Sequence, residues 1–323
     1  MGRSVSVVLI TFNDARTLPR CLEGVRGQRG IPIDVTVIDN ASADRSVELC
    51  RNALPQARLI ENEKNLGFAA AANQGIEASK ADFVLLVNPD AFLEPHYAAT
   101  LAREIESSGI DFGSATGLLL RAVGDELSPT PTIDSMGIRM TRSGRHFDDG
   151  AGQQWIDRPI SNHEVFGVSA AAALYRRSFL TDAAIDGKAF DEDFFVYRED
   201  ADLAWRGRIF GWKSIFVPSA IAYHQRRVTP EVRSTLPASI NMHSVKNRFL
   251  LRLNNEGLHL ALRNAPFEFS RDLLVLGASL TIERTSFPAI VWLVRNRKRI
   301  LERRKKIQSR RRVNDQQLAH WFG

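Results

Sequence analysis

The hydrophobic positions in the first part of the chain form short runs separated by amphipathic stretches. Strands are expected at 4–10, 33–38, 58–60 and 83–87, and apolar residues at three- and four-residue spacing between the first two predict a helix. The run at 83–87 contains no polar residue, which is typical of a central strand buried on both faces. Strands alternating with helices at this pitch predict right-handed βαβ units, a parallel sheet and an α/β fold.

Short polar side chains follow these predicted strands. They are Thr11, Asn13, Asp39, Asn40, Ser42, Asn65, Asn88 and Asp90. Carboxyl ends of parallel strands meet at one sheet edge, where open α/β sheets place their ligands, and Asp39 suits a ribose or a base edge. Asn and Asp also serve as ordinary turn residues and helix caps. Because four such loops converge, with Asp90 as a fifth element, we favour a nucleotide crevice, although neither a Gly-x-Gly-x-x-Gly turn nor a P-loop is present.

Composition is that of an ordinary soluble protein of 323 residues, but its charge is uneven. Residues 295–312 hold 11 Lys/Arg and one acid, a local charge of +10, which leaves −4 for the rest of the chain from the total of +6. Two cysteines, Cys21 and Cys50, indicate neither a disulfide framework nor a metal site and fit a reducing compartment. The chain enters its first strand at once and lacks an 18-residue apolar run, so we expect neither a signal peptide nor a spanning helix.

Several motifs, in their order along the chain, resemble the family 2 glycosyltransferases of GT-A fold, and most closely their bacterial rhamnosyltransferase-like branch. The motifs are Val7-Val8-Leu9-Ile10-Thr11-Phe12-Asn13, Val37-Ile38-Asp39-Asn40-Ala41-Ser42, Asn65-Leu66-Gly67-Phe68-Ala69-x-x-x-Asn73-x-Gly75 and Leu86-x-Asn88-Pro89-Asp90. The likeness covers about residues 4–250. It implies a catalytic domain at 1–250, with a nucleotide-sugar half at 1–120 and an acceptor half at 121–250, and leaves 251–323 as a helical, basic extension.

The resemblance also implies a set of donor-binding residues. They are Thr11, Phe12, Asn13, Asp39, Asn40, Ser42, Asn65, Gly67, Phe68, Asn73, Asn88 and Asp90. In the family, the last aspartate holds a divalent ion, Mg²⁺ or Mn²⁺, that bridges the diphosphate of a nucleotide-sugar. Here Asn88 replaces the first acid of the usual Asp-x-Asp. His224 falls where metal-dependent members carry a second ligand of the ion or a diphosphate contact, and a structural histidine is the alternative.

A second set of candidates lies in the acid cluster before Leu203. Glu199 and Asp200 open a predicted helix, and acids there complement its dipole, which is the simple interpretation for Asp202. A direct displacement at a sugar carbon also needs one base for the acceptor's hydroxyl proton, and a carboxylate suits that task. Glu199-Asp200-x-x-Leu203 resembles the family's Glu-Asp-x-x-Leu motif, whose aspartate is the base. Asp200 is therefore the predicted base and Glu199 a residue that orients the acceptor.

Other stretches are assigned less specific roles. A buried strand of small residues at 167–177 leaves room for a substrate, and the resemblance puts the donor sugar and acceptor near Gly167 and Ser169. Residues 122–160 read as loops and short hairpins, in which a surface turn is favoured over a functional role for His146 and Asp148-Asp149. The run 215–224 predicts an edge-like strand. In the family, the next segment, 225–236, closes over the donor; we expect it to be mobile, with Arg226 and Arg227 pairing with phosphate.

The last third begins with a helix at 240–253 that carries Lys246, Asn247 and Arg248. Two apolar runs, 273–282 and 287–294, lead into the basic segment, which favours docking on an anionic membrane face. A helical subdomain packed on the core and a solvated tail are the alternatives. An acidic remainder and the absence of a nucleic-acid module argue against a nucleic-acid partner.

Together these features predict an inverting, metal-assisted hexosyltransferase that uses a nucleotide-sugar, with dTDP-L-rhamnose implied by the resemblance. The expected acceptor is a lipid-linked or cell-surface glycan, and the expected location is the cytoplasmic face of the cell membrane. A galactofuranosyl- or other hexosyltransferase of the same fold is the first alternative. A non-catalytic nucleotide-binding scaffold is the second.

Overall fold

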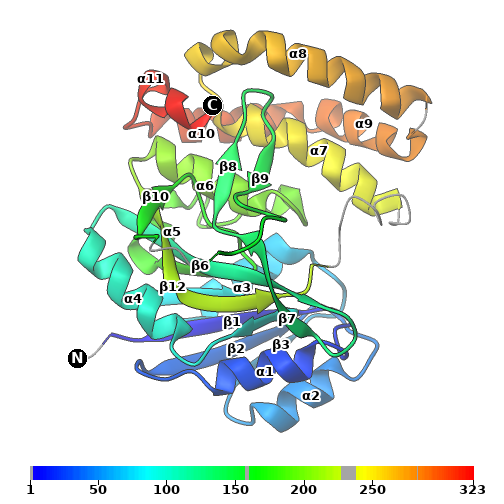
Figure 1. Cartoon of the computed structure of the whole chain (residues 1–323). Coiled ribbons are helices and arrows are strands. Elements are labelled where there is room, and N and C mark those ends of the chain that lie inside the picture. Colours follow the sequence, from blue (N-terminus) through cyan, green and yellow to red (C-terminus); the bar gives the residue numbers. More distant parts are fainter. Residues whose placement is uncertain (1–2, 157–159, 227–237, 282) are drawn as a thin grey trace.

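The computed structural model describes residues 3–156, 160–226, 238–281 and 283–323. Figure 1 shows how its elements are arranged. The strands are β1 (Val5–Thr11), β2 (Ile33–Asp39), β3 (Arg58–Glu61), β4 (Phe83–Val87), β5 (Ala91–Leu93), β6 (Phe112–Val123), β7 (Ser128–Ser135), β8 (Ile138–Met140), β9 (His146–Asp148), β10 (His163–Val165), β11 (Ala172–Arg176) and β12 (Lys213–His224). The α-helices are α1 (Leu18–Arg26), α2 (Ser46–Ala53), α3 (Phe68–Ala78), α4 (Tyr97–Ser108), α5 (Arg177–Ala183), α6 (Glu199–Ile209), α7 (Ala238–Asn255), α8 (Leu258–Thr281), α9 (Phe287–Arg295), α10 (Arg297–Ser309) and α11 (Asp315–Leu318).

The central sheet joins ten strands of the described residues in the order β10-β12-β6-β11-β4-β1-β2-β3, with β5 on β12 and β7 on β6. Strands β3, β2, β1 and β4 are parallel, so the predicted βαβ units are confirmed. Strand β11 runs antiparallel between β4 and β6, which makes the sheet mixed. The prediction of an edge-like strand at 215–224 is wrong, because β12 pairs with β6 on one side and with β10 and β5 on the other.

Both faces of the sheet are covered by helices, as the unbroken apolar run in β4 predicts. Phe83, Leu85 and Val87 pack into one core with α1 and α4, whereas Val84 and Leu86 pack into a second core with α3 and α5. The period-two alternation of a strand sends successive side chains to opposite faces, so a strand with helices on both sides has no position left for a polar residue.

The carboxyl-terminal helices are stacked on the rest of the molecule. In Figure 1, α7 lies next to α6, α9 and α10 lie beside α7, and α8 crosses the top of the molecule. Trp205 of α6, Leu250 and Leu251 of α7, and Ile300 of α10 share one buried core. Among the described helices, none is both long and apolar enough to cross a bilayer.

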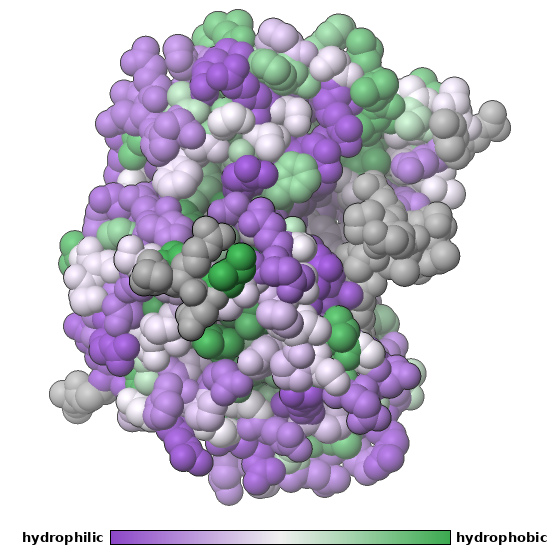
Figure 2. All heavy atoms as spheres, viewed as in Figure 1, coloured by the Kyte–Doolittle hydropathy of each residue, from purple (hydrophilic) through white to green (hydrophobic). Residues whose placement is uncertain are grey.

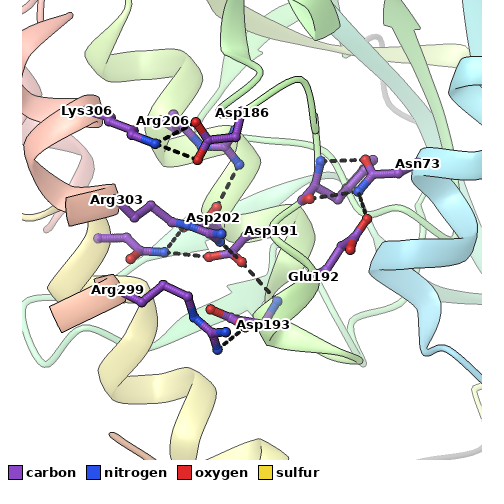
Figure 3. A network of polar contacts seen from close by, with 12 residues as sticks. Asn73, Asp186, Asp191, Glu192, Asp193, Asp202, Arg206, Arg299, Arg303 and Lys306 are labelled. Carbon is purple, nitrogen blue, oxygen red and sulfur yellow. Dashed lines mark hydrogen bonds and ion pairs between the residues drawn. The ribbon is translucent and has the colours of Figure 1, made fainter. Parts of the chain in front are cut away.

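The basic segment packs against the acidic stretch 186–193 (Figure 3). On α10, Arg303 pairs with Asp191, Arg299 lies 2.7 Å from Asp193 (Nη2 to Oδ1), and Lys306 lies 2.6 Å from Asp186 (Nζ to Oδ1). Of the three predicted arrangements for 295–312, the structure therefore has the helix packed on the core. These three cations form ion pairs with carboxylates of the same chain. Only part of the segment's positive charge can therefore interact with another surface.

Candidate active site

Three predicted polar strand ends meet at one edge of the sheet. Thr11 at the end of β1 is the register partner of Asp39 at the end of β2, and Leu9 is the partner of Val87, directly before Asn88. This convergence follows from the parallel pairing of β2, β1 and β4. The structure therefore brings Thr11, Asp39 and Asn88 together.

The loop after β1 is held by the loop after β2. The amide nitrogen of Asn13, whose φ is 57°, donates to Ser42 Oγ at 3.0 Å, and Ala43 N donates to Asn13 Oδ1 at 2.8 Å. Ser42 N donates to Asp39 Oδ2 at 3.0 Å. Asp39 Oδ1 is buried without a hydrogen-bond partner among the described residues, so this pair of loops offers one acceptor for a donor group of a ligand.

The predicted asparagines near α3 stabilise the protein itself. Asn40 Nδ2 donates to Gly67 O at 3.2 Å, and Gly67 N donates to Asn65 Oδ1 at 2.8 Å. Buried Asn73 donates to Phe190 O at 2.9 Å and accepts from Phe190 N at 3.0 Å. Asn40, Asn65 and Asn73 thus make hydrogen bonds within the fold, and their contact with the donor stays a prediction.

A cavity of about 370 Å³ opens beside this edge. It is lined by six residues predicted from the sequence, and by others that were not. The predicted ones are Phe68, Asn88, Ser169, Glu199, Asp200 and His224. Gly167 is not among the lining residues, because it packs on α6, where a Cβ on it would lie 2.3 Å from Ala204 Cβ. Phe12 is exposed outside the cavity.

Asp200 lies in the first turn of α6 and reaches the cavity. Its Oδ1 accepts a hydrogen bond from Ala201 N at 2.7 Å, and its Oδ2 accepts one from Ala170 N at 3.4 Å. Burial, and then the charge of Asp148, raise the pKa of Asp200 to about 6. Burial and the charge of Asp200 raise the pKa of Glu199 well above its ordinary value, which favours its protonated form.

The turn before Asp200 has an unusual backbone. Phe195, Tyr197 and Arg198 have φ values of 65°, 68° and 73°, in the left-handed region that residues other than glycine seldom occupy. Such conformations persist only where the surroundings enforce them, and they cluster at functional sites.

Two other elements hold this turn in place. Nδ2 of Asn247 on α7 lies 2.8 Å from the carbonyl oxygens of Phe194, Val196 and Tyr197. At the start of α3, Gly67 has φ +84°, and a Cβ on it would lie 2.5 Å from the Phe195 ring. The residues Lys246-Asn247-Arg248 were predicted to lie on a helix, but their contact with the acid cluster was not foreseen.

A chain of alternating charges links Asp90 to the acid cluster. His224 Nε2 lies 3.2 Å from Asp90 Oδ1, and His224 Nδ1 lies 2.8 Å from Asp134 Oδ2. Arg226 in turn pairs with Asp134 at 2.7 Å and Asp148 at 2.5 Å. Burial alone would lower the pKa of His224, but the two neighbouring carboxylates raise it to about 10.

This chain corrects two interpretations of the sequence. His146 and Asp148 are not in a surface turn: they lie on β9 and line the cavity. Burial, and then Arg198, lower the pKa of His146 to about 3, so its ring is neutral. Arg226 pairs with carboxylates, whereas Arg227 and the rest of the expected mobile segment up to 236 lie outside the described residues. Asp134 was missed, and its only sequence signal is an acid within the strand-like run 132–135.

Asp90 and His224 form a donor pair that suits a divalent ion once His224 has released its Nε2 proton, because only the neutral imidazole coordinates a metal. A carboxylate oxygen and an imidazole Nε2 face each other, and the other ring nitrogen is fixed by Asp134, the arrangement that metal-binding histidines usually have. Among the described residues, no group of three or more His, Cys, Asp or Glu side chains could hold a metal. Ion binding here would need oxygen ligands from a bound molecule as well.

Comparison with known proteins agrees with this architecture. Residues 6–119 match the family model for Glycosyl transferase family 2. The N-acetylglucosaminyl-diphospho-decaprenol L-rhamnosyltransferase of Mycobacterium tuberculosis is 28% identical over 242 residues, which cover 68% of this chain and 75% of that protein.

Solved structures of low sequence identity share the fold. The mannosyltransferase PcManGT from Pyrobaculum calidifontis, in complex with GDP-Man and Mn²⁺, has a TM-score of 0.53 at 16% identity and covers 95% of this chain and 85% of its own. GalNAc-T7 with UDP, GalNAc and Mn²⁺ has a TM-score of 0.63 at 15% identity, and covers 78% of this chain and 48% of its own. Both likenesses show the predicted GT-A fold.

Proposed function

Because the chain carries a family 2 glycosyl transferase domain on a GT-A fold, we propose that it transfers a sugar from a nucleotide-sugar to an acceptor hydroxyl with inversion. The observation that carries this proposal is one cavity bordered both by Asp200 and by His224, which contacts Asp90. A direct displacement needs a base on one side of the sugar and charge stabilisation for the leaving diphosphate on the other. These side chains meet both needs.

In this reaction, the acceptor oxygen forms a bond to the anomeric carbon while the bond from that carbon to the diphosphate breaks. Asp200 takes the hydroxyl proton. Its raised pKa makes it a stronger base than an exposed aspartate while it is still mostly ionised at neutral pH. Glu199, held neutral by burial and by Asp200, has a proton to donate in a hydrogen bond that orients the acceptor.

Asp90 and His224 are the residues that would hold Mg²⁺ or Mn²⁺, with Asp134 fixing the imidazole. When bound, such an ion acts as a Lewis acid for the charge on the leaving diphosphate. The free acceptor oxygen of Asp39 would take a hydrogen bond from the ribose or base, beside the loops that Asn13 and Ser42 hold together.

The proposed donor is dTDP-L-rhamnose. The resemblance of the motifs and the similarity to an L-rhamnosyltransferase support it. A panel of nucleotide-sugars tested by thermal shift with Mg²⁺ or Mn²⁺ checks it, since a ligand of the folded form raises Tm. The largest shift should come from dTDP-L-rhamnose, with inverted product on addition of acceptor. A larger shift with a galactofuranose or another hexose donor would favour the first alternative, and binding without transfer or hydrolysis would favour a scaffold.

We further propose that the protein works at a membrane surface on a lipid-linked or cell-surface glycan. Helix α8 exposes Leu258, Leu262, Phe269, Leu273 and Leu280, which at 3.6 residues per turn fall within an arc of about 60°. Figure 2 shows green, apolar side chains along the top of the molecule, where Figure 1 places α8. An apolar stripe of this kind suits a helix lying in the plane of a membrane interface.

Replacing both Leu262 and Leu273 by Glu should weaken binding to phosphatidylglycerol vesicles by about tenfold or more. The reason is that two exposed leucines which the membrane would bury are lost. Co-sedimentation measures the effect. Val123→Glu is the matched control, because Val123 is also an exposed apolar residue but ends β6 rather than lying on α8. Equal vesicle binding by all three proteins would contradict the proposed surface.

The acidity of Asp200 predicts a pH profile. Since the folded-state pKa is raised to about 6, the base loses activity as pH falls through that value, and kcat/KM should drop about tenfold per unit below it. Asp148→Asn removes a negative neighbour, so the acid limb should move to lower pH. Asp149→Asn is the control, because its more exposed side chain faces Arg139. An acid limb that does not move in Asp148→Asn would belong to another group.

A further inference from the structure

A second cavity, of about 350 Å³, adjoins the first. Arg198 and Ser244 line both of them. Its other walls come from the loop before β9, from α7 and from α8. Four arginines contribute to the lining, and Glu283 is its one acid among the described residues. The arginines are Arg145, Arg198, Arg248 and Arg271.

Among these side chains, Arg248 gives the strongest indication of a bound anion. It is 5% exposed, and its Nε and Nη2 atoms are buried with no hydrogen-bond partner among the described residues. Arg271 Nε is in the same state. Burial, followed by the charge of Arg271, lowers the pKa of Arg248 to about 10, so the guanidinium remains charged at neutral pH. Asp272 attracts it from nearby but pairs with Arg252.

A buried cation without a counter-ion is costly, and proteins pair nearly all such groups. Here several arginines lie close together, and the charge of each raises the free-energy cost of burying the others. A bound molecule with two or more negative charges would reverse this cost, and guanidinium groups match phosphate oxygens in geometry. The arrangement therefore favours a phosphorylated ligand over a carboxylate or a neutral sugar.

Part of the cavity wall is apolar. Leu274, Val275 and Ala278 of α8 line the cavity, on the same helix that exposes the leucine stripe. Arg198, which borders both cavities, is two residues before Asp200. A ligand with its charge at the arginines would therefore extend its chain along α8 and its head group toward Asp200.

We propose that this arginine cavity binds the diphosphate of an isoprenoid-linked acceptor. Its sugar lies at Asp200, and its chain lies along α8. The proposal rests on the glycosyltransferase function, for which it names the class of acceptor. The diphosphate of the donor lies elsewhere, beside Asp90 and His224.

Binding is tested first, without divalent ions and without a donor, so that its outcome does not depend on catalysis. The probes are inorganic pyrophosphate, farnesyl diphosphate and farnesol. Farnesyl diphosphate should bind most tightly, pyrophosphate more weakly and farnesol least. Arg248→Gln should weaken binding of both diphosphates by about ten- to a hundredfold, the usual range for a lost hydrogen bond to a charged group. Arg297→Gln, which alters an exposed arginine of α10, should leave binding unchanged.

The same variant separates a ligand-binding role from a structural one. If Arg248 awaits an anion, Arg248→Gln removes an unpaired charge, and Tm should stay the same or rise. A fall in Tm with unchanged diphosphate binding would overturn the proposal. Binding of pyrophosphate as tight as that of farnesyl diphosphate would overturn the isoprenoid part. Arg248→Lys keeps the charge and should restore part of the affinity.

Transfer assays then compare one acceptor sugar on a prenyl diphosphate with the same sugar on a neutral alkyl chain. In Arg248→Gln, KM should rise about tenfold or more for the diphosphate acceptor and stay constant for the alkyl glycoside. An equal effect on both acceptors would contradict the proposal. If no donor supports transfer in wild-type protein, the proposed function fails, and the binding arm still decides whether the cavity holds a diphosphate.

Discussion

Asp200→Asn is expected to lower kcat by about a thousandfold, within the range that a positioned general base contributes. The amide keeps the shape and can still accept from Ala201 N, but it cannot take the acceptor proton. Donor affinity should be unchanged, because the variant acts only on the acceptor side. Quenched-flow transfer assays and donor titration measure the two quantities separately.

A contrasting variant lies two residues further along α6. Asp202 is buried and lies 2.7 Å from Arg206 (Oδ2 to Nη2), and Asn255 Nδ2 donates to its Oδ1 at 2.7 Å. Asp202→Asn leaves the cation of Arg206 buried without its partner, at a cost of about 3–5 kcal/mol of unfolding free energy. Asp200→Asn should instead keep Tm, since ionised Asp200 is itself disfavoured by burial. Near-normal transfer by Asp200→Asn would remove Asp200 as the base.

Asp90→Ala is expected to weaken donor binding in the presence of Mn²⁺ by about a hundredfold or more, because even second-sphere changes cost ten- to a hundredfold in metal affinity. Asp90 supplies one of the two protein atoms in the proposed ion site, the other being His224 Nε2. Calorimetric titration with the nucleotide-sugar, with and without Mn²⁺, isolates the effect. Without metal, wild type and variant should bind the donor alike.

A matched carboxylate for this test is Asp111, which precedes β6 at the opposite end of the strands and pairs with Lys213 at the surface. Asp111→Ala should leave donor binding unchanged at every metal concentration. If Asp90→Ala keeps full affinity with Mn²⁺ present, the ion binds elsewhere or contributes nothing to donor binding.

Local sequence patterns were sufficient for the parallel half of the sheet. A run such as 83–87 has one physical solution, since five apolar residues without a polar face must be covered on both sides. The pattern failed at β12, because the run 215–224 looks the same on a sheet edge as it does between the parallel β6 and the antiparallel β5 and β10. It also failed at 146–148. There, turn-forming residues surround a short strand, and His146 and Asp148 of that strand line the cavity.

The sequence predicted those residues of the candidate site that follow a recognisable strand end or belong to a recognisable motif. Asp90, Asp200 and His224 were found in this way, and the structure places Asp200 and His224 at one cavity, with Asp90 in contact with His224. Asn40 and Asn73 share the same motifs, yet their amides bond within the fold. A sequence motif does not say whether a polar residue faces a ligand or its own backbone.

By itself, the sequence determined the α/β fold, the edge at which polar loops gather and the two carboxylates that distinguish the proposed chemistry. Tertiary structure alone decided what surrounds them, because Asp134, Asp148 and Asn247 reach the site from strands and helices far away in the chain. It also decided where the basic segment goes, since counter-charges such as Asp186 and Asp191 become visible only once α10 has docked. The energy of an ion pair depends on the distance between its charges and on their burial, and neither quantity can be read from the sequence alone.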